Sequence, residues 1–271
     1  MTHLSANKTI IEQCFKDGSY DKKNGKYYFL ALEEEEYEKD YLNKFKGMLK
    51  KNHKLYRFLI DLFSPIYTFP SKRHLNKFMN SYFKESGKVG INIGAGNTNI
   101  SDEIINCDIF AYDHVDVVCD IAELPFKDNS IDFVVNVAVL EHVPNPEAVV
   151  KEIYRVLKKD GRVYSLFPFM QGFHASPYDF SRRTIPGIKK LYEDFEIEEV
   201  KGLGGPTSGF LWIFQEWVAL LFSFGIKPLY KLIFFLMLIL TWPIKFIDVL
   251  LRHHPMAENI SSSFTLIGTK K

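Results

Sequence analysis

The stretch VGINIGAGNTN, Val89–Asn99, runs from a short apolar segment into a glycine-rich turn. An apolar run of this length that ends in glycines is typical of a buried strand followed by a loop. Glycine residues let the backbone approach a ligand closely, and a helix that begins after the turn presents free N–H groups. The turn by itself leaves two interpretations open, a nucleotide-binding loop or an ordinary turn without a ligand.

The residues after this turn alternate between strand-like and helical patterns, which predicts an α/β fold with a parallel sheet and crossover helices. Further strands are expected at residues 104–109, 115–120, 131–139 and 161–169, and a closing pair at 195–200 and 262–270. A helix is expected between Asn145 and Gly161, because Asn145 can cap it, Pro146 can open it and Gly161 can close it.

Two acidic residues follow consecutive strands after the glycine turn. Asp108 ends the second strand, where a carboxylate can accept hydrogen bonds from both ribose hydroxyls. Asp120 follows the third strand, where it can accept from an adenine amino group while the apolar Ile121 covers the ring. Each acid taken singly could be an ordinary turn residue. Together, after a glycine loop, they favour a cofactor that contains adenosine.

The run from Cys119 to Phe169 carries LPF, VLEHV and EIYRVLKKDG in that order. In this it resembles the core of class I S-adenosylmethionine-dependent methyltransferases of the small-molecule type, over about residues 88–200. The resemblance implies a Rossmann-like, seven-stranded sheet with its last strand antiparallel, helices on both faces, and S-adenosylmethionine bound across the carboxyl ends of the strands. It also implies, position by position, a set of cofactor-binding residues: Asn92, Gly94, Ala95, Gly96, Asp108, Asp120, Ile121 and Asn136.

Three features depart from the family pattern. Asn92 stands where the first strand usually has an acid, and Asn97 stands in place of a third small residue. The short link from Asp108 to Asp120 leaves no room for a normal crossover helix, which must be lost or reduced to a turn. An alternative hypothesis follows, in which the chain is a degenerate, non-catalytic methyltransferase fold that acts as a membrane-proximal scaffold.

The acceptor side is predicted in residues 168–187, PFMQGFHASPYDFSRRTIPG, which follow the fifth strand. The segment contains the string H-x-x-P-x-D-x-x-R-x-T, similar to one in sugar and cell-envelope methyltransferases. We expect His174 or His142 to act as general base and Asp179 to orient it. The residues expected to bind the acceptor are Tyr178, Arg182 and Arg183, with the two arginines holding an anionic group. The alternative is structural, with loop-ordering hydrogen bonds for the histidines and salt bridges for the arginines.

A hydrophobic insertion occupies about residues 205–256. Its longest uncharged run, Leu232–Ile244, is shorter than the roughly 20 residues that cross a bilayer, so no transmembrane helix is expected. Three tryptophans and flanking lysines fit a peripheral membrane contact through residues 210–251. A cap over the acceptor pocket or a homodimer interface is the alternative. Either arrangement gives an apolar acceptor site, which points to a small-molecule, glycan or lipid-linked acceptor from envelope or secondary-metabolite biosynthesis.

Residues 1–87 are expected to be an N-terminal extension, and residues 88–271 the methyltransferase domain. The extension should contain a hairpin that turns at Asn24-Gly25, followed by helices at Glu33–Lys51 and His53–Phe63. Residues 10–30 faintly resemble a small zinc-ribbon domain, but Cys14 lacks the paired cysteines of a zinc site, so no metal is assigned.

The totals of the sequence set further limits. A net charge of +1 gives no general attraction to nucleic acid, and such a partner is not expected. Three scattered cysteines suit a reducing compartment, and the N-terminal residues lack the pattern of a signal peptide. We therefore expect a cytoplasmic protein, peripheral on the inner face of the membrane.

Overall fold

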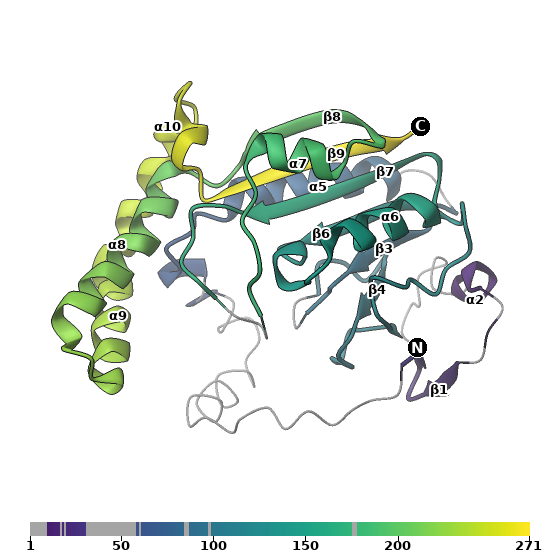
Figure 1. The fold of residues 1–271 in the computed structure, drawn as a ribbon, viewed down its shortest axis with the longest axis horizontal. Coiled ribbons are helices and arrows are strands. Elements are labelled where there is room, and N and C mark those ends of the chain that lie inside the picture. The colour runs from purple at the N-terminus through teal and green to yellow at the C-terminus, as the bar shows by residue number, and fades with distance from the viewer. Residues whose placement is uncertain are drawn as a thin grey trace.

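The computed structural model describes residues 10–16, 18, 20–30, 58–59, 61–83, 87–96, 99–174 and 178–271. Its centre is a sheet in the order β1-β2-β5-β4-β3-β6-β7-β9-β8 (Figure 1). The strands are β1 (Asp21–Lys23), β2 (Lys26–Tyr28), β3 (Gly90–Ile93), β4 (Ile105–Asp108), β5 (Val117–Val118), β6 (Ile131–Val137), β7 (Leu157–Pro168), β8 (Phe195–Gly202) and β9 (Ser263–Lys270).

The seven strands β3 to β9 form the Rossmann-like sheet that the sequence predicts. Strands β5, β4, β3, β6 and β7 are parallel neighbours, and β9 is antiparallel to both β7 and β8. The expected antiparallel last strand is therefore confirmed. Because β8 runs in the same direction as β7, its carboxyl end lies at the same edge of the sheet as those of β3 and β6.

The strand count of seven is wrong, since the N-terminal hairpin adds two strands. Asn24 and Gly25 have φ angles of 51° and 78°, so the turn takes the left-handed conformation that this residue pair favours. Strand β2 then pairs in parallel with β5, with Tyr27 opposite Val117. The sequence predicts the turn correctly, but a three-residue strand carries no signal for which edge it will join.

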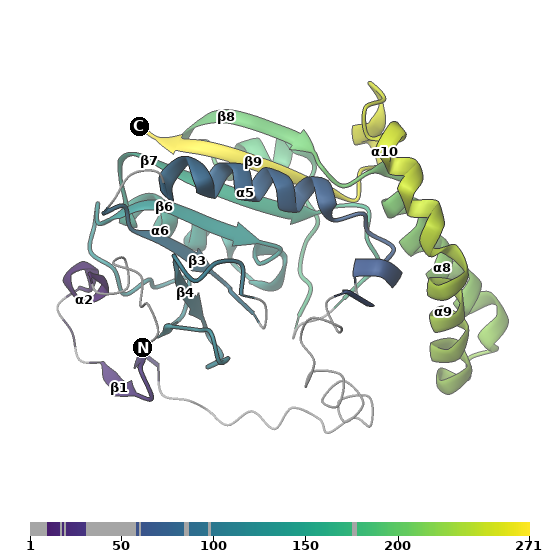
Figure 2. The ribbon, with the colours of Figure 1, turned by 180° about the vertical axis from the view of Figure 1, so that it is seen from behind.

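Helices cover both faces of the sheet, as expected (Figures 1 and 2). Alternate residues of β6 show the two layers: Phe133 and Val135 pack in one cluster with α5 (Phe69–Phe83), whereas Val134 packs in the other with α6 (Pro146–Val156). Helix α7 (Ile185–Leu191) lies on the α6 face, and its Ile188 belongs to the same cluster.

Helix α6 begins as predicted, with the Asn145 side chain accepting from the Ala148 N–H and Pro146 in the first turn. It ends at Val156 and not near Gly161, because Leu157 already has an extended backbone and starts β7. Residues 109–116, between β4 and β5, form turns, so the crossover helix is absent there as expected. The helix expected at Glu33–Lys51, most of that at His53–Phe63, and Asn97 lie outside the described residues.

The insertion folds into α8 (Pro206–Ser223) and α9 (Lys227–Thr241), which we call the apolar hairpin, and it projects away from the sheet (Figure 2). It continues through the turns of η2 (Trp242–Ile247) into α10 (Asp248–Leu251). Together, Lys227–Leu251 are long and apolar enough to cross a membrane by length and composition. This segment is longer than the uncharged run Leu232–Ile244, because the helical segment continues past Lys245.

Two buried charges hold the base of this insertion: Lys245 binds the segment before α5, and Asp248 binds the first turn of α8 within the insertion. The Lys245 ammonium donates to the carbonyl oxygens of residues 61, 62 and 64 at 2.6, 2.8 and 2.8 Å. The Asp248 carboxylate accepts from the N–H groups of Thr207 and Ser208, both at 2.8 Å, in the first turn of α8. Each charge thus satisfies several backbone groups that burial would otherwise leave unpaired.

Candidate functional site

The glycine turn after β3 forms a cradle that is closed by Asp108. Gly94 and Gly96 have φ angles of 64° and 58°, which glycine adopts without strain. The Gly96 N–H donates to one carboxylate oxygen of Asp108 at 2.7 Å, and the Phe110 N–H donates to the other at 2.9 Å. Burial raises the pKa of Asp108, and these two N–H groups partly offset the rise. The carboxylate is thereby held at the end of β4, where it has acceptor capacity left for a hydroxyl-bearing ligand.

The remaining predicted cofactor residues lie in three settings. Ala95 is buried in the cradle and donates its N–H to the Cys107 carbonyl at 3.0 Å. Asp120 is exposed just past the end of β5, next to the buried Ile121, and accepts from the Ala122 N–H at 2.8 Å. Since β4 and β5 pair directly, Asp120 lies at the same edge of the sheet as Asp108.

Two asparagines lie within the sheet and not at its rim. The Asn92 amide donates to Asn106 on the neighbouring strand at 3.0 Å, and its side chain is buried. Asn136 is completely buried and donates to the Ser165 hydroxyl at 2.7 Å. That hydroxyl also lies 2.7 Å from the Tyr192 hydroxyl. The structure therefore shows both asparagines in contacts between sheet elements.

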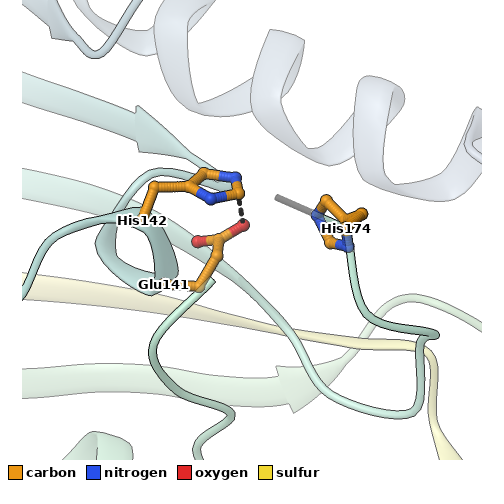
Figure 3. Close-up of side chains that lie close together, drawn as sticks. All are labelled: Glu141, His142 and His174. Carbon is orange, nitrogen blue, oxygen red and sulfur yellow. Dashed lines mark ion pairs between the residues drawn. The ribbon is translucent and has the colours of Figure 1, made fainter. Parts of the chain in front are cut away.

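Glu141, His142 and His174 come together beside the cradle strands (Figure 3). Glu141 and His142 lie on the 3-10 helix η1 (Leu140–His142), and His174 lies in the loop after β7. The two imidazole rings are 5.4 Å apart and nearly perpendicular. The Nδ1 atom of His142 hydrogen-bonds the Tyr178 carbonyl, while the Tyr178 ring is largely exposed.

Asp179 orders the predicted acceptor loop. Its carboxylate binds the Arg182 guanidinium at both oxygens and accepts from the His174 N–H at 3.0 Å. Burial would raise the pKa of Asp179, but the Arg182 guanidinium and the His174 N–H together lower it. Burial also lowers the pKa of His174, so this imidazole is neutral near pH 7. A neutral imidazole is the form that can accept a proton.

Arg183 forms its ion pair with a different carboxylate from that of Arg182. Its guanidinium forms an ion pair with Glu147 of α6 at 2.7 Å, while its Nε atom is buried without a hydrogen-bond partner among the described residues. The same is true of the Arg182 Nε. Both arginines thus retain a buried donor besides the ion pair that holds them.

Glu141 is a further candidate, to which no role was assigned from the sequence. Its side chain is buried, and neither carboxyl oxygen has a hydrogen-bond partner among the described residues. The nearest histidine nitrogen, Nε2 of His142, is 3.6 Å away. Burial raises the pKa of Glu141 to about 7. The signal available in the sequence was the acid of the LEH string, but its burial follows from tertiary packing.

The donor atoms of Glu141, His142 and His174 lie within 4.8 Å of one another, a spacing that a metal ion could also use. A metal would require an ionised carboxylate and two neutral imidazoles. Without a metal, burial raises the pKa of Glu141 to about 7, so this carboxyl group carries a proton for a large share of the time at neutral pH. The metal-free cluster is therefore suited to holding and moving a proton.

The base of the apolar hairpin touches this cluster. The Trp212 ring of α8 lies 5.5 Å from the His174 ring, and its indole N–H packs against Gly172 of the same loop. A cavity of about 340 Å³ lies between loop and hairpin, lined by Gly172, Phe173, Ile213, Glu216 and Tyr230. The predicted acceptor loop and the hydrophobic insertion are therefore neighbours in space.

The order of these strands, loops and acids agrees with one family model. Residues 88–165 match the model described as a methyltransferase domain. This part of the chain therefore contains a methyltransferase domain. The matched segment runs from the start of the cradle to the middle of β7, so it contains Asp108, Glu141 and His142.

Curated methyltransferases are similar to about a third of the chain or less. A ubiquinone/menaquinone biosynthesis C-methyltransferase of Brucella canis is 30% identical over 87 residues, which are 32% of this chain and 28% of the relative. A demethylmenaquinone methyltransferase of Anoxybacillus flavithermus is 38% identical over 72 residues, 26% of this chain and 30% of the relative. The match thus spans less than a third of these relatives' length.

Solved structures of methyltransferases are similar over more of the chain. The 1,6-didemethyltoxoflavin-N1-methyltransferase of Burkholderia thailandensis has a TM-score of 0.47 and 12% identity, covering 83% of this chain and 86% of that one. The phosphoethanolamine N-methyltransferase 2 of Haemonchus contortus has a TM-score of 0.44 and 17% identity, covering 73% of this chain and 52% of that one.

Proposed function

We propose that this chain transfers a methyl group from S-adenosylmethionine to an acceptor held at a membrane surface, on the cytoplasmic side. The family, the glycine cradle and the acid after β4 support the cofactor. The apolar hairpin beside the acceptor loop supports the location. The acceptor is a glycan, a lipid-linked intermediate or another small molecule with an apolar part.

The cradle fits the cofactor in two respects. A side-chain carbon added at Gly96 would meet no atom of the described residues within 4 Å, so these residues leave space where the backbone turns toward a ligand. Asp108 is held by two N–H groups and can still accept from the ribose hydroxyls. In this proposal Asp120 and Ile121 bind the adenine, and Ala95, with the glycines, lines the methionine end. The cofactor supplies an activated methyl group on a sulfonium centre.

Proximity and orientation can provide most of the rate of such a transfer, since the methyl group moves in one in-line displacement. For a hydroxyl acceptor a base is also needed. We assign this role to the cluster of Glu141, His142 and His174, with Asp179 and Arg182 positioning His174. Tyr178 and Arg183 flank the cluster and are proposed to contact the acceptor.

The proposed membrane contact rests on the arrangement of side chains in the apolar hairpin, in which polar side chains are buried between the helices and apolar ones are exposed. The buried residue of α9 is Thr241, and it is bonded to the buried Gln215 of α8 at 2.6 Å. The apolar side chains face outward instead, and Trp217, Leu220, Phe235 and Leu240 are each more than half exposed. Surfaces of this kind mark membrane or protein contacts, because exposing them to water is unfavourable. Lys245 remains bonded to residues 61, 62 and 64 outside the insertion, so we propose that the hairpin enters one leaflet without crossing the bilayer.

The test of the proposed function is a calorimetric titration with S-adenosylmethionine. We expect binding in the micromolar range for the wild type, and a loss of about tenfold to a hundredfold in Asp108→Ala, as removal of a hydrogen bond to a charged group costs about 1.5–3 kcal/mol. Asp194→Ala changes an equally charged but distant exposed residue and should bind like the wild type. An absence of heat in the wild type would contradict enzyme function and favour the scaffold hypothesis.

A further inference from the structure

A second cavity, of about 620 Å³, lies on the α5 side of the molecule and has a strongly basic wall. It is bounded by α5, by the end of β8 and by the residues after α10. The basic and imidazole side chains that line it are Arg73, His74, Lys77, Lys201, Arg252 and His253. None of these residues belongs to the site described above, so the cavity requires its own explanation. We call it the basic cavity.

Several of these charges lack compensation. Arg73 and Lys77 are exposed, lie one helical turn apart on α5, and form no ion pair with the residues that the structure describes. Arg252 contacts the imidazole of His253, which is not an acid. Glu199 pairs with Lys201 and also lies 3.1 Å from His74, so one carboxylate balances one cation. The cavity therefore keeps a positive excess.

The position of the basic cavity links it to the apolar surface. Strand β8 ends at Gly202, at the sheet edge from which the apolar hairpin projects. Arg252 directly follows α10, where Leu250 and Leu251 are 76% and 42% exposed. An apolar surface thus runs up to the mouth of a cationic cavity. This arrangement is complementary to an anionic lipid, whose charged headgroup is joined to hydrocarbon chains.

We propose that the basic cavity binds the phosphate group of an anionic phospholipid whose acyl chains lie along α10 and the apolar hairpin. Arginine suits this ligand because its planar guanidinium can donate two parallel hydrogen bonds to phosphate oxygens. The proposal rests on the membrane contact proposed above and is independent of methyl transfer. It predicts that the protein prefers membranes with anionic lipid over neutral ones.

Sedimentation with lipid vesicles tests this proposal on the full chain. The probes are vesicles of phosphatidylcholine and vesicles in which a third of the lipid is phosphatidic acid. We expect binding to both, with tighter binding to the second. Arg73→Gln combined with Lys77→Gln should reduce this preference about tenfold or more, since each cation near an anionic surface contributes about 1 kcal/mol. Arg252→Gln, on the opposite wall, should reduce it in the same direction.

The matched control is Lys151→Gln combined with Lys189→Gln, which removes the same charge from exposed positions of α6 and α7 on the other face. It should keep the preference. Equal binding of the wild type to both vesicles, or an equal loss in variant and control, would overturn the proposal. If inorganic phosphate binds tightly in calorimetry and the protein shows no preference between the vesicles, the ligand of the cavity is a soluble phosphate and the lipid proposal is wrong. Loss of binding to neutral vesicles would contradict the hairpin contact instead.

Discussion

In the sheet, Ile91, Ile93 and Val134 are fully buried, whereas in the apolar hairpin Leu220, Phe222 and Phe235 are each more than half exposed. The buried side chains of the hairpin are polar to a large extent, including Ser208, Gln215, Ser223 and Thr241. One chain thus contains a region that folds by removing apolar surface from water and a region that leaves it outside. The difference leaves the apolar surface of the hairpin available for a contact, which we propose is with lipid.

The largest expected effect is on vesicle binding, when exposed apolar residues of the hairpin are replaced. Phe222→Ser combined with Phe235→Ser should weaken binding to phosphatidylcholine vesicles about a hundredfold or more, because each exposed phenyl group contributes about 1.5–3 kcal/mol when buried. Vesicle sedimentation measures the change. The control, Leu30→Ser combined with Ile109→Ser, alters exposed apolar residues of the sheet region and should leave vesicle binding unchanged. If the wild type instead dimerises through the hairpin, light scattering will show a dimer that the serine variant lacks.

The next effect concerns a buried acid in the sheet region. The pKa of Glu141 is raised to about 7 in the folded protein from 4.5, so the folded state keeps a proton that the unfolded state releases. Stability should therefore fall as the pH rises from about 4.5 to about 7, by about 3 kcal/mol in total. Glu141→Gln removes this penalty, so its melting temperature should change less than that of the wild type between pH 5.5 and pH 8. Parallel pH dependence in both proteins would show that Glu141 is not the source.

A smaller effect compares two glycines with left-handed backbones, one in each region. Gly96 and Gly225 have φ angles of 58° and 78°, and an added side-chain carbon meets nothing within 4 Å at either. Alanine should cost about 1–2 kcal/mol of stability at each position. S-adenosylmethionine binding should weaken in Gly96→Ala and stay the same in Gly225→Ala. Calorimetry and melting curves separate the two effects, and an equal loss of binding in both variants would contradict the cradle.

The smallest expected effect is that of metal removal. Because Glu141 is proposed to hold a proton among the histidines, EDTA should leave the melting temperature unchanged, within about a degree. A metal bound to Glu141, His142 and His174 would stabilise the folded state by mass action, and its removal would lower the melting temperature. Such a decrease, reversed by zinc, would replace the proton-transfer role with a metal site.

The sequence predicts features that depend on local chemistry. Asn145 and Pro146 place the start of α6, and Asn24-Gly25 places the first turn, because each residue acts on its own backbone. The predicted end of α6 was wrong. Leu157 already pairs in β7, so the helix ends at Val156 and does not continue to Gly161. The position of β2 and the burial of Glu141 depend on contacts between distant segments. No local pattern encodes them.

The sequence pattern also does not reveal which side chains of the hairpin face inward. The insertion was expected to be apolar, but in the structure the polar Gln215 lies buried against Thr241. The direction in which a helix turns its polar face depends on its partner helix. Sequence alone left a cap, a dimer interface and a membrane contact open, and the membrane contact is our proposal.

The most direct test of the account uses S-adenosylmethionine with a labelled methyl group and vesicles made from the lipids of the organism's own membranes. The account predicts that label enters the organic phase with the wild type. It predicts far less label with Asp108→Ala and with the Phe222→Ser, Phe235→Ser variant. Detergent-dissolved lipid should restore labelling in the second variant, whose site is intact. Equal labelling by the hairpin variant on vesicles would contradict the account, and cofactor binding without any label in lipid would contradict a lipid-linked acceptor.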